Sequence, residues 1–165
     1  MNYNRLNDQI VFIDKRDTVV FGNPETASEI MIGTDKFYFH NKGYVEKVTE
    51  YLTINLGINQ KVKFVGSAKK DGFGSYSAIS NSVNLNTQDA VGNKEKADEN
   101  HTYKSITTYY LIDKNNTIVL ATEKNISSAS PQYKKEIKTF ISSNKTNFKK
   151  RADIEKLLEF TNSLK

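Results

Sequence analysis

The first two-thirds of the chain consists of short runs of β-branched and aromatic residues, each followed by residues typical of turns. The first four runs are QIVFID (9–14), DTVVFG (17–22), SEIMIG (28–33) and KFYFH (36–40). Runs this short and this close together favour antiparallel pairing of neighbours, because a parallel pair needs a long crossover connection. The sequence therefore predicts a meander of β-hairpins rather than βαβ units.

Turn residues separate these runs. Lys15-Arg16 joins the first two runs and Thr34-Asp35 joins the third and fourth. NPE (23–25) and NKG (41–43) turn the chain between hairpins. Proline fixes φ, and asparagine and glycine tolerate the left-handed region, so both segments suit reversals of chain direction.

Four later runs extend the predicted sheet. They are VTEYLTINL (48–56), KVKFVG (61–66), SITTYYLID (105–113) and TIVLAT (117–122). In the first of them, Leu52, Ile54 and Leu56 alternate with polar residues as in one half-buried strand. The last two flank Lys114-Asn115-Asn116 and predict a hairpin. Residues 84–102 are polar, charged and without period, which predicts a mobile loop.

Two helices are predicted at the C-terminal end of the chain. The first begins with Ser130 as N-cap and Pro131 at the first helical position, and Asn144 is its expected C-cap. The second spans residues 151–164. Apolar side chains recur at helical spacing in both and predict one buried stripe per helix. The stripes are Tyr133, Ile137, Phe140 and Ile141 in the first helix and Ile154, Leu157, Leu158 and Leu164 in the second.

These elements together predict an α+β fold, in which a curved antiparallel β-sheet (a meander of hairpins) is closed by two C-terminal helices. A chain of 165 residues has the size of one domain. We therefore predict a single domain over residues 1–165, with residues 1–122 mainly β and residues 130–165 forming the two helices.

The composition excludes several kinds of site. The chain has no cysteine, which excludes disulfides, thiolate metal sites and cysteine nucleophiles. Its two histidines, His40 and His101, belong to no zinc-ligand spacing pattern and define no catalytic triad. No apolar run reaches the length of a membrane span, and the first residues lack a signal-peptide pattern.

The segment KKDGFGSYSAISNS (69–82) most resembles a working site. It offers G-x-G-x-x-S, which lacks the third small residue of a dinucleotide-binding loop. It also lacks the G-K-[ST] of a P-loop and the G-x-S-x-G of a nucleophile elbow. The segment is interpreted as a glycine-containing turn whose aromatic residues, Phe73 and Tyr76, pack on the sheet. No catalytic, cofactor-binding or metal-binding residue is therefore predicted.

The positive charge lies at the C-terminal end. The net charge is +5, and residues 131–165 contain nine Lys or Arg and four Asp or Glu, so the other 130 residues are neutral. Such a segment either contacts an acidic partner, a lipid surface or nucleic acid, or is a solvated helix face. The candidate binding residues are Lys134, Lys138, Lys149, Lys150 and Arg151. No groove-reading motif accompanies them, so no specific nucleic-acid binding is predicted.

Aromatic residues are the other candidates for binding. Phe37-Tyr38-Phe39 and Tyr109-Tyr110 alternate across strand faces, so one member of each set is expected to point outward. Outward tyrosines stack on sugars or bases, or form cross-strand pairs that stabilise the sheet. Tyr38, Tyr76 and Tyr109 are the candidate binding tyrosines.

Several motifs in order resemble a group of proteins. Tyr3-Asn4, Asn23-Pro24-Glu25, the 32–38 hairpin (Ile-Gly through Tyr), GYVE (43–46) and the glycine-aromatic segment 69–82 are similar to uncharacterised secreted proteins of Bacteroidetes-type bacteria, and the tail from Tyr109 onwards also resembles theirs. The resemblance implies export to the cell envelope, with the signal peptide removed from this chain, and it implies no known activity. It supplies no site residue.

The sequence thus favours a non-enzymatic envelope or secreted module that binds a protein or a glycan. One alternative is a hydrolase whose site is not assembled by any sequence motif. Another is electrostatic docking of the basic C-terminal helices onto an anionic polymer or a lipid surface. No cofactor is expected, and the location is predicted to be periplasmic, outer-membrane associated or extracellular.

Overall fold

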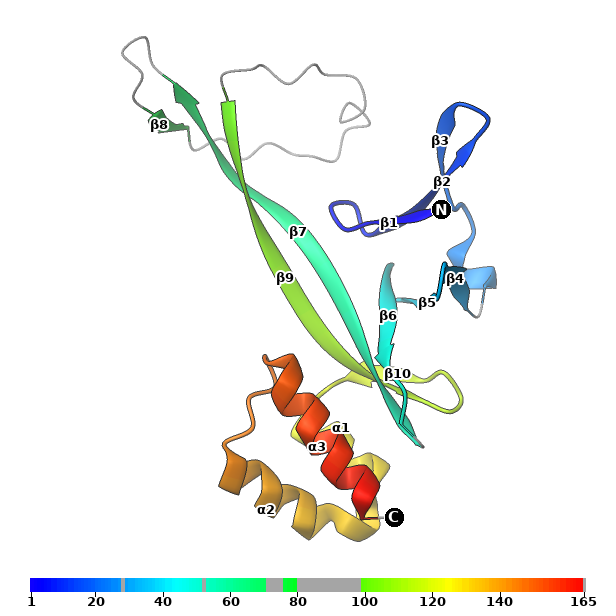
Figure 1. Cartoon of the computed structure of the whole chain (residues 1–165), viewed down its shortest axis with the longest axis vertical. Coiled ribbons are helices and arrows are strands. Elements are labelled where there is room, and N and C mark those ends of the chain that lie inside the picture. Colours follow the sequence, from blue (N-terminus) through cyan, green and yellow to red (C-terminus); the bar gives the residue numbers. More distant parts are fainter. Residues whose placement is uncertain (28, 52, 71–75, 80–98, 165) are drawn as a thin grey trace. The chain divides into compact units, whose positions relative to one another are not determined.

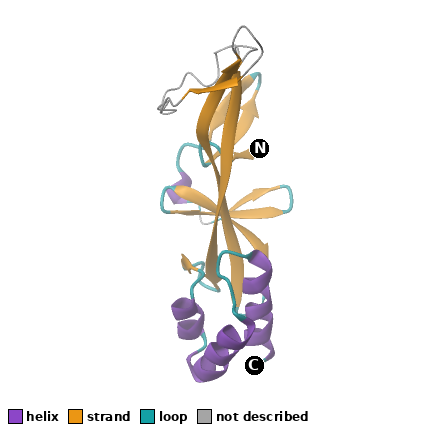
Figure 2. Cartoon of the chain, turned by 90° about the vertical axis from the view of Figure 1, so that its left-hand side faces the viewer, coloured by secondary structure: helices purple, strands orange, loops and turns teal. Residues whose placement is uncertain are grey.

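The computed structural model describes residues 1–27, 29–51, 53–70, 76–79 and 99–164 (Figure 1). It has curled antiparallel sheets and three helices near the C-terminal end of the chain, so the predicted α+β class with an antiparallel sheet is confirmed (Figure 2). Contacts divide the chain into two compact units. The first comprises 1–61 and 107–165, and the second comprises 62–106. The assignment of a single domain stays a prediction.

The N-terminal strands of the first unit form a three-stranded antiparallel sheet in the order β1-β2-β3. Its strands are β1 (Asn2–Asn4), β2 (Gln9–Asp14) and β3 (Asp17–Val20). The β2–β3 hairpin has the predicted position, and Lys15 in its turn has φ of 58°. Strand β1 was not predicted, because three polar and aromatic residues carry no alternation that sequence patterns detect.

The remaining strands form a seven-stranded antiparallel sheet. Its order is β10-β9-β7-β6-β5-β4, and β8 pairs with β7. The strands are β4 (Ile30–Ile32), β5 (Asp35–His40), β6 (Gly43–Thr49), β7 (Ile54–Lys70), β8 (Tyr76–Ile79), β9 (Glu99–Asp113) and β10 (Ile118–Leu120), and the short 3₁₀ helix η1 (Pro24–Thr26) precedes β4. The predicted 105–122 hairpin corresponds to the end of β9 and β10.

Two predictions about strands and one about a turn are wrong. The segment 48–56 is not one strand, because β6 ends at Thr49, β7 begins at Ile54 and Thr49 pairs with Leu56 across the hairpin. Residues 61–66 lie inside β7 rather than forming a separate strand. The β4–β5 turn is at 33–34 and not 34–35, since Gly33 takes a φ of 63° that suits glycine.

Residues 84–98 of the predicted loop lie outside the described residues. Residues 99–102 belong to the start of β9. In the glycine-aromatic segment 69–82, residues 71–75 and 80–82 also lie outside them. Residues 76–79 of that segment form β8. The expectation that this segment is only a turn therefore misses a strand, which pairs with β7.

The helices are α1 (Glu123–Ala129), α2 (Lys134–Asn144) and α3 (Arg151–Ser163), with the 3₁₀ turn η3 (Pro131–Tyr133) before α2. The last two correspond to the predicted helices, and α1 is additional. Its start is capped by Thr122, whose side chain accepts from the Asn125 N–H. Ser130 and Pro131 take the predicted N-cap and first positions, but of η3 rather than of α2, and the buried Ser130 side chain makes no cap hydrogen bond. Lys145, not Asn144, takes the left-handed position that ends α2.

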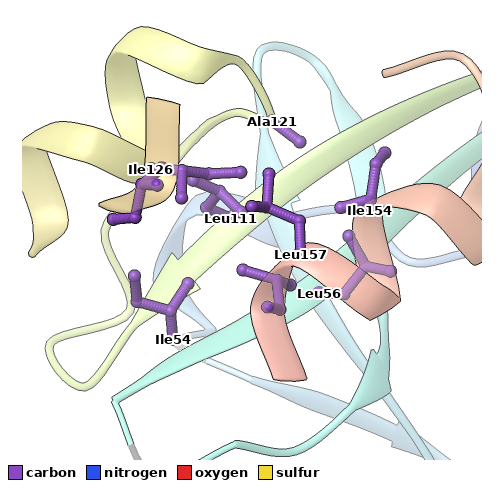
Figure 3. Packing of buried hydrophobic residues seen from close by; sticks show 9 residues of the cluster. Ile54, Leu56, Leu111, Ala121, Ile126, Ile154 and Leu157 are labelled. Atoms are coloured by element: carbon purple, nitrogen blue, oxygen red, sulfur yellow. The ribbon is translucent and has the colours of Figure 1, made fainter. Parts of the chain in front are cut away.

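The helices pack on the sheet through one apolar core (Figure 3). Ile54, Leu56 and Leu111 come from β7 and β9, and the helices contribute Ile126, Ile137, Ile154, Leu157 and Leu158. The predicted burial of the two helical stripes is confirmed at Ile137, Leu157 and Leu158. Phe140 is half-buried against this core and stacks on Phe160 with ring centroids 4.4 Å apart.

Strand β5 has a core on each of its faces. Phe37 belongs to a cluster with Ile10, Ile30 and Tyr44, which joins the seven-stranded sheet to the three-stranded one. Tyr38 belongs to a second cluster with Val45 and Ile112 inside the curl of the large sheet. Both faces of β5 are therefore covered, so the Tyr38 side chain is buried.

Candidate functional site

A cleft of about 580 Å³ opens in the first unit and is lined by residues of strands β1, β2, β4, β5 and β6. Its volume is within the range of small-ligand sites. The lining combines two aromatic rings, two aliphatic side chains, two amides and three charged groups. These residues are Asn2, Tyr3, Asn4, Arg5, Val11, Ile32, Asp35, Phe37 and Glu46.

Hairpin register brings the acidic residues to this cleft. Phe37 of β5 pairs with Glu46 of β6, so their side chains share one face of the sheet. Asp35 lies two residues before Phe37 and therefore faces the same side. The turn between the strands is at 41–42, where Asn41 and Lys42 both have positive φ (49° and 62°). That turn geometry fixes the register and with it the proximity of the two carboxylates.

Tyr3 forms an aromatic wall of the cleft. Its ring lies 5.3 Å from that of Phe37 and 6.2 Å from that of Tyr44, measured between centroids. Its hydroxyl donates to Asp8 Oδ1 at 2.6 Å. Burial, together with the neighbouring Asp8 carboxylate, raises the pKa of Tyr3 far above its usual value. The phenol therefore stays protonated and holds its ring in place against the cleft.

Asp8 is the centre of a buried polar cluster behind this wall. Its side chain is 8% exposed, and its carboxylate accepts from the Tyr44 N–H at 3.0 Å and from Asn59 Nδ2 at 3.2 Å. Lys61 Nζ lies 2.7 Å from Asp8 Oδ2. Burial alone would raise the pKa of Asp8, but the hydrogen bonds from Lys61, Tyr3 and Tyr44 outweigh it and lower that pKa. The cluster ties the 4–9 segment to β6 and β7.

The Asp8 cluster also explains one glycine. A Cβ atom at Gly43 would collide with the Asp8 carboxylate group. Gly43 pairs with His40 at the start of β6, directly after the 41–42 turn. Glycine is therefore required here for the close approach of the carboxylate, which holds the start of β6 against the 4–9 segment.

Glu46 differs from Asp8 because no described residue contacts its carboxylate with a hydrogen bond or an ion pair. Its side chain is half-buried. Burial raises the pKa of Glu46, the charge of Asp35 raises it further, and Arg5 and Arg151 lower it. The carboxylate thus lines the cleft, and among the described residues it has no cation in direct contact, although Arg5 and Arg151 act on it from a distance.

Tyr38 and Tyr109, two of the three predicted binding tyrosines, are not in the lining of this cleft. Tyr38 is 5% exposed and donates its hydroxyl to Glu29 Oε2 at 2.7 Å, so the expectation that one member of 37–39 points outward is wrong. The reason is that both faces of β5 are covered. Tyr109 is half-buried against the helical core. Tyr76 lies in β8, and its side chain is outside the described part of the structure.

The predicted basic residues are on the surface of the helical end. Lys134 and Lys138 are exposed on α2, and Lys149 and Lys150 are exposed just before α3. Arg151 is also exposed, and its Nε lies 2.7 Å from Glu155 Oε1. The binding role of all five residues stays a prediction. They form no part of the cleft lining.

Histidine does not complete a catalytic or metal site in the described residues. His40 is half-buried beside Tyr110, with ring centroids 5.5 Å apart, and burial lowers its pKa. The side chain of His101 lies outside the description. In the part of the chain that the structure covers, no three or more His, Cys, Asp or Glu residues gather as metal ligands would.

Sequence reasoning missed Arg5, Asp35 and Glu46. One signal could have found the last two. A two-residue turn at 41–42 places residue pairs whose numbers add to 83 opposite each other, and Phe37 with Glu46 is such a pair. The contribution of Arg5 depends on the packing of two sheets, which no local pattern gives.

Comparison of the chain with family models, curated proteins and solved structures finds no match. Among the helices that the structure describes, none has both the length and the apolar character needed to cross a bilayer. The interpretation of the cleft therefore depends on its own residues.

Proposed function

We propose that the chain is a non-enzymatic binding module, exported to the cell envelope or secreted, and that the cleft holds part of a protein or glycan partner. The observation that carries this proposal is the lining of the cleft, which joins the Tyr3 and Phe37 rings to the Glu46 carboxylate, unpaired among the described residues. Concave sites that combine apolar walls with a few polar groups are typical of ligand binding. The proposed location rests on the resemblance to secreted proteins.

Binding is favoured over hydrolysis by how the polar groups are held. A pair of carboxylates serves glycoside hydrolysis, and Asp35 with Glu46 is the acidic pair of this cleft. Catalytic groups are normally fixed by supporting hydrogen bonds. Here Asp35 is exposed and has a 3.3 Å contact from the Thr34 hydroxyl, and Glu46 has no such support among the described residues. Ligand recognition requires less rigid positioning of these two carboxylates than catalysis does.

Blocking the cleft is expected to abolish binding. Val11→Phe introduces a ring at a half-buried lining position of β2. Ile13→Phe is the matched control, since Ile13 lies two residues further along the same strand, is 76% exposed and is not in the lining. Both variants and the native chain are screened on peptide and glycan arrays. We expect loss of at least about tenfold in affinity for Val11→Phe alone, which corresponds to about 1.4 kcal/mol.

The comparison of Val11→Phe with Ile13→Phe tests the proposal. Circular dichroism and the thermal midpoint verify that both variants fold. If Val11→Phe and Ile13→Phe bind every native ligand equally well, the cleft is not the binding site and the proposal is overturned.

A second candidate function is electrostatic docking through the helical end. It is favoured by the exposure of Lys134, Lys138, Lys149 and Lys150, for which the described residues contain no ion-pair partner. An exposed cationic surface attracts anionic polymers through release of their counterions.

This docking is expected to be weak and sensitive to salt. The affinity for dextran sulfate, measured by fluorescence anisotropy, falls as NaCl rises from about 50 mM to about 150 mM. Lys149→Glu/Lys150→Glu reduces it further, whereas Lys114→Glu/Lys124→Glu, with the same change in charge outside the segment, does not. Equal loss in both double variants means that net charge alone acts, and sub-micromolar sequence-dependent binding of nucleic acid at about 150 mM salt contradicts weak docking.

A further inference from the structure

We propose that the cleft binds a lysine or arginine side chain of an extended peptide, with the cationic head group between Glu46 and Asp35. This inference rests on the proposed function and names the class of ligand. It is argued from the charge, the apolar walls and the amide groups of the cleft.

The carboxylates of the cleft favour a cationic ligand. Glu46 is half-buried and unpaired among the described residues, and Asp35 is on the same face of the sheet. A partly desolvated carboxylate beside another carboxylate is unfavourable until a positive group approaches. Burial and Asp35 accordingly raise the pKa of Glu46. A bound ammonium or guanidinium group would remove this penalty through charge-assisted hydrogen bonds.

The walls of the cleft match the stem of such a side chain. Val11 and Ile32 are half-buried aliphatic residues, and the ring of Phe37 completes the apolar surface. Lysine and arginine bury their methylene groups along apolar surfaces while their charged ends meet polar groups. A neutral sugar would use the rings but would leave Glu46 unpaired. Apolar walls that end at carboxylates therefore favour a basic side chain over a neutral glycan.

The amide side chains of the cleft are poised as donors. Asn2 Oδ1 already accepts from the Tyr3 N–H at 2.8 Å, and Asn4 Oδ1 accepts from the Leu6 N–H at 3.0 Å. Their Nδ2 groups have no partner among the described residues. Amide donors suit the carbonyl groups of a peptide backbone. Because both oxygens already accept backbone hydrogen bonds, they have less capacity left to coordinate a hard cation such as Ca²⁺, which needs six to eight oxygens.

Arg5 allows a direct test of the proposed binding of a cationic side chain. It lines the cleft and lowers the pKa of Glu46, so its positive charge competes with that of a cationic ligand. Removing the Arg5 charge should therefore tighten the binding of a basic peptide, whereas removing the Glu46 charge should weaken it. A purely structural role for either residue would not produce opposite signs.

The test uses the full chain labelled with ¹⁵N and two matched peptides, acetyl-Thr-Val-Lys-Val-Thr-amide and its analogue with norleucine at the central position. Glucosamine and N-acetylglucosamine form the glycan pair. Binding is followed by shifts of the amide signals of Tyr3, Phe37 and Glu46. The variants are Glu46→Gln, Arg5→Gln and the control Glu25→Gln, which changes an exposed carboxylate in η1.

We expect the lysine peptide to shift these signals and the norleucine peptide to bind at least about tenfold more weakly. Glu46→Gln should lower the affinity for the lysine peptide by about tenfold, Arg5→Gln should raise this affinity by a few fold, and Glu25→Gln should leave it unchanged.

Three results overturn the inference. Equal binding of both peptides removes the requirement for a cation but leaves cleft binding intact, provided that Val11→Phe still blocks it. Binding of glucosamine without the lysine peptide assigns the site to an amino sugar. No shift of the cleft signals with the lysine peptide rejects the basic side chain as ligand, and the array comparison of Val11→Phe with Ile13→Phe then decides the proposed function separately.

Discussion

Asp8→Ala is expected to lower the free energy of unfolding by about 3–5 kcal/mol, because the buried Asp8 carboxylate is the acceptor for several donors at once. The change removes the acceptor of the Tyr3 hydroxyl, the Tyr44 N–H and the Asn59 amide. Each buried donor left without an acceptor costs about 1–3 kcal/mol. Asp8 also has φ of 53°, a left-handed conformation that alanine adopts less readily than aspartate.

Asp8→Asn separates the charge from the shape of this side chain. Asparagine tolerates the positive φ and keeps an oxygen acceptor, so we expect a smaller loss of stability than for alanine. It also removes the acid-sensitive group. Because the pKa of Asp8 is lowered on folding, its contribution is present above the ordinary value of 3.8 and is lost as the pH falls through its lower folded value.

Urea unfolding at neutral pH and at acid pH measures both effects. Asp17→Ala is the control, since Asp17 is an exposed aspartate at the start of β3. The native chain should lose more stability on acidification than Asp8→Asn does. Identical acid dependence in the two proteins, or a loss in Asp8→Ala no larger than in Asp17→Ala, would show that the cluster does not stabilise the fold.

Local signals were enough to predict much of the fold. The β2–β3 hairpin and the end of β9 with β10 follow from alternating residues around turns, and α3 follows from its apolar stripe. Each of these elements is determined by residues close together in sequence. The class of the fold follows from them, because adjacent hairpins pair antiparallel and the helical stripes need a sheet to cover.

The errors arise where contacts between residues distant in sequence determine the structure. Leu52, Ile54 and Leu56 alternate as in one strand, but the chain reverses before Ile54, and a period of two does not reveal a turn between strands of similar composition. Tyr38 was a candidate for outward exposure because the side chains of 37–39 alternate across the strand. Alternation gives opposite faces, and only the packing of the three-stranded sheet and the curl of the large sheet determine that both are covered.

The cleft was missed for a related reason. Glu46 and Asp35 belong to a charge-rich hairpin in which neither residue stands out. Their meeting depends on strand register, and the partial burial of Glu46 depends on the three-stranded sheet that packs nearby. Sequence analysis instead selected the tyrosines and lysines that composition made conspicuous. Abundance of a residue type indicates what a surface can do, but packing decides which of its members are accessible.

Leu158→Ala is expected to cost about 2–5 kcal/mol of unfolding free energy, the usual range for truncating a buried leucine. Leu158 is 3% exposed and lies in the core between the helices and the large sheet. Alanine favours the helix, so the loss would come from the cavity and the missing contacts rather than from helix propensity. Lys156→Ala tests this point, because Lys156 is exposed on the same helix.

Urea unfolding of Leu158→Ala and Lys156→Ala gives the comparison, with Phe140→Ala as an intermediate case because Phe140 is half-buried. An unchanged midpoint for Leu158→Ala would mean that α3 is not packed on the sheet as described. Leu158 is not part of the cleft lining. Affinity at the cleft should therefore persist in this variant below its unfolding transition, whereas Glu46→Gln should lose affinity for the lysine peptide with little loss of stability, so that binding and folding defects arise from different residues.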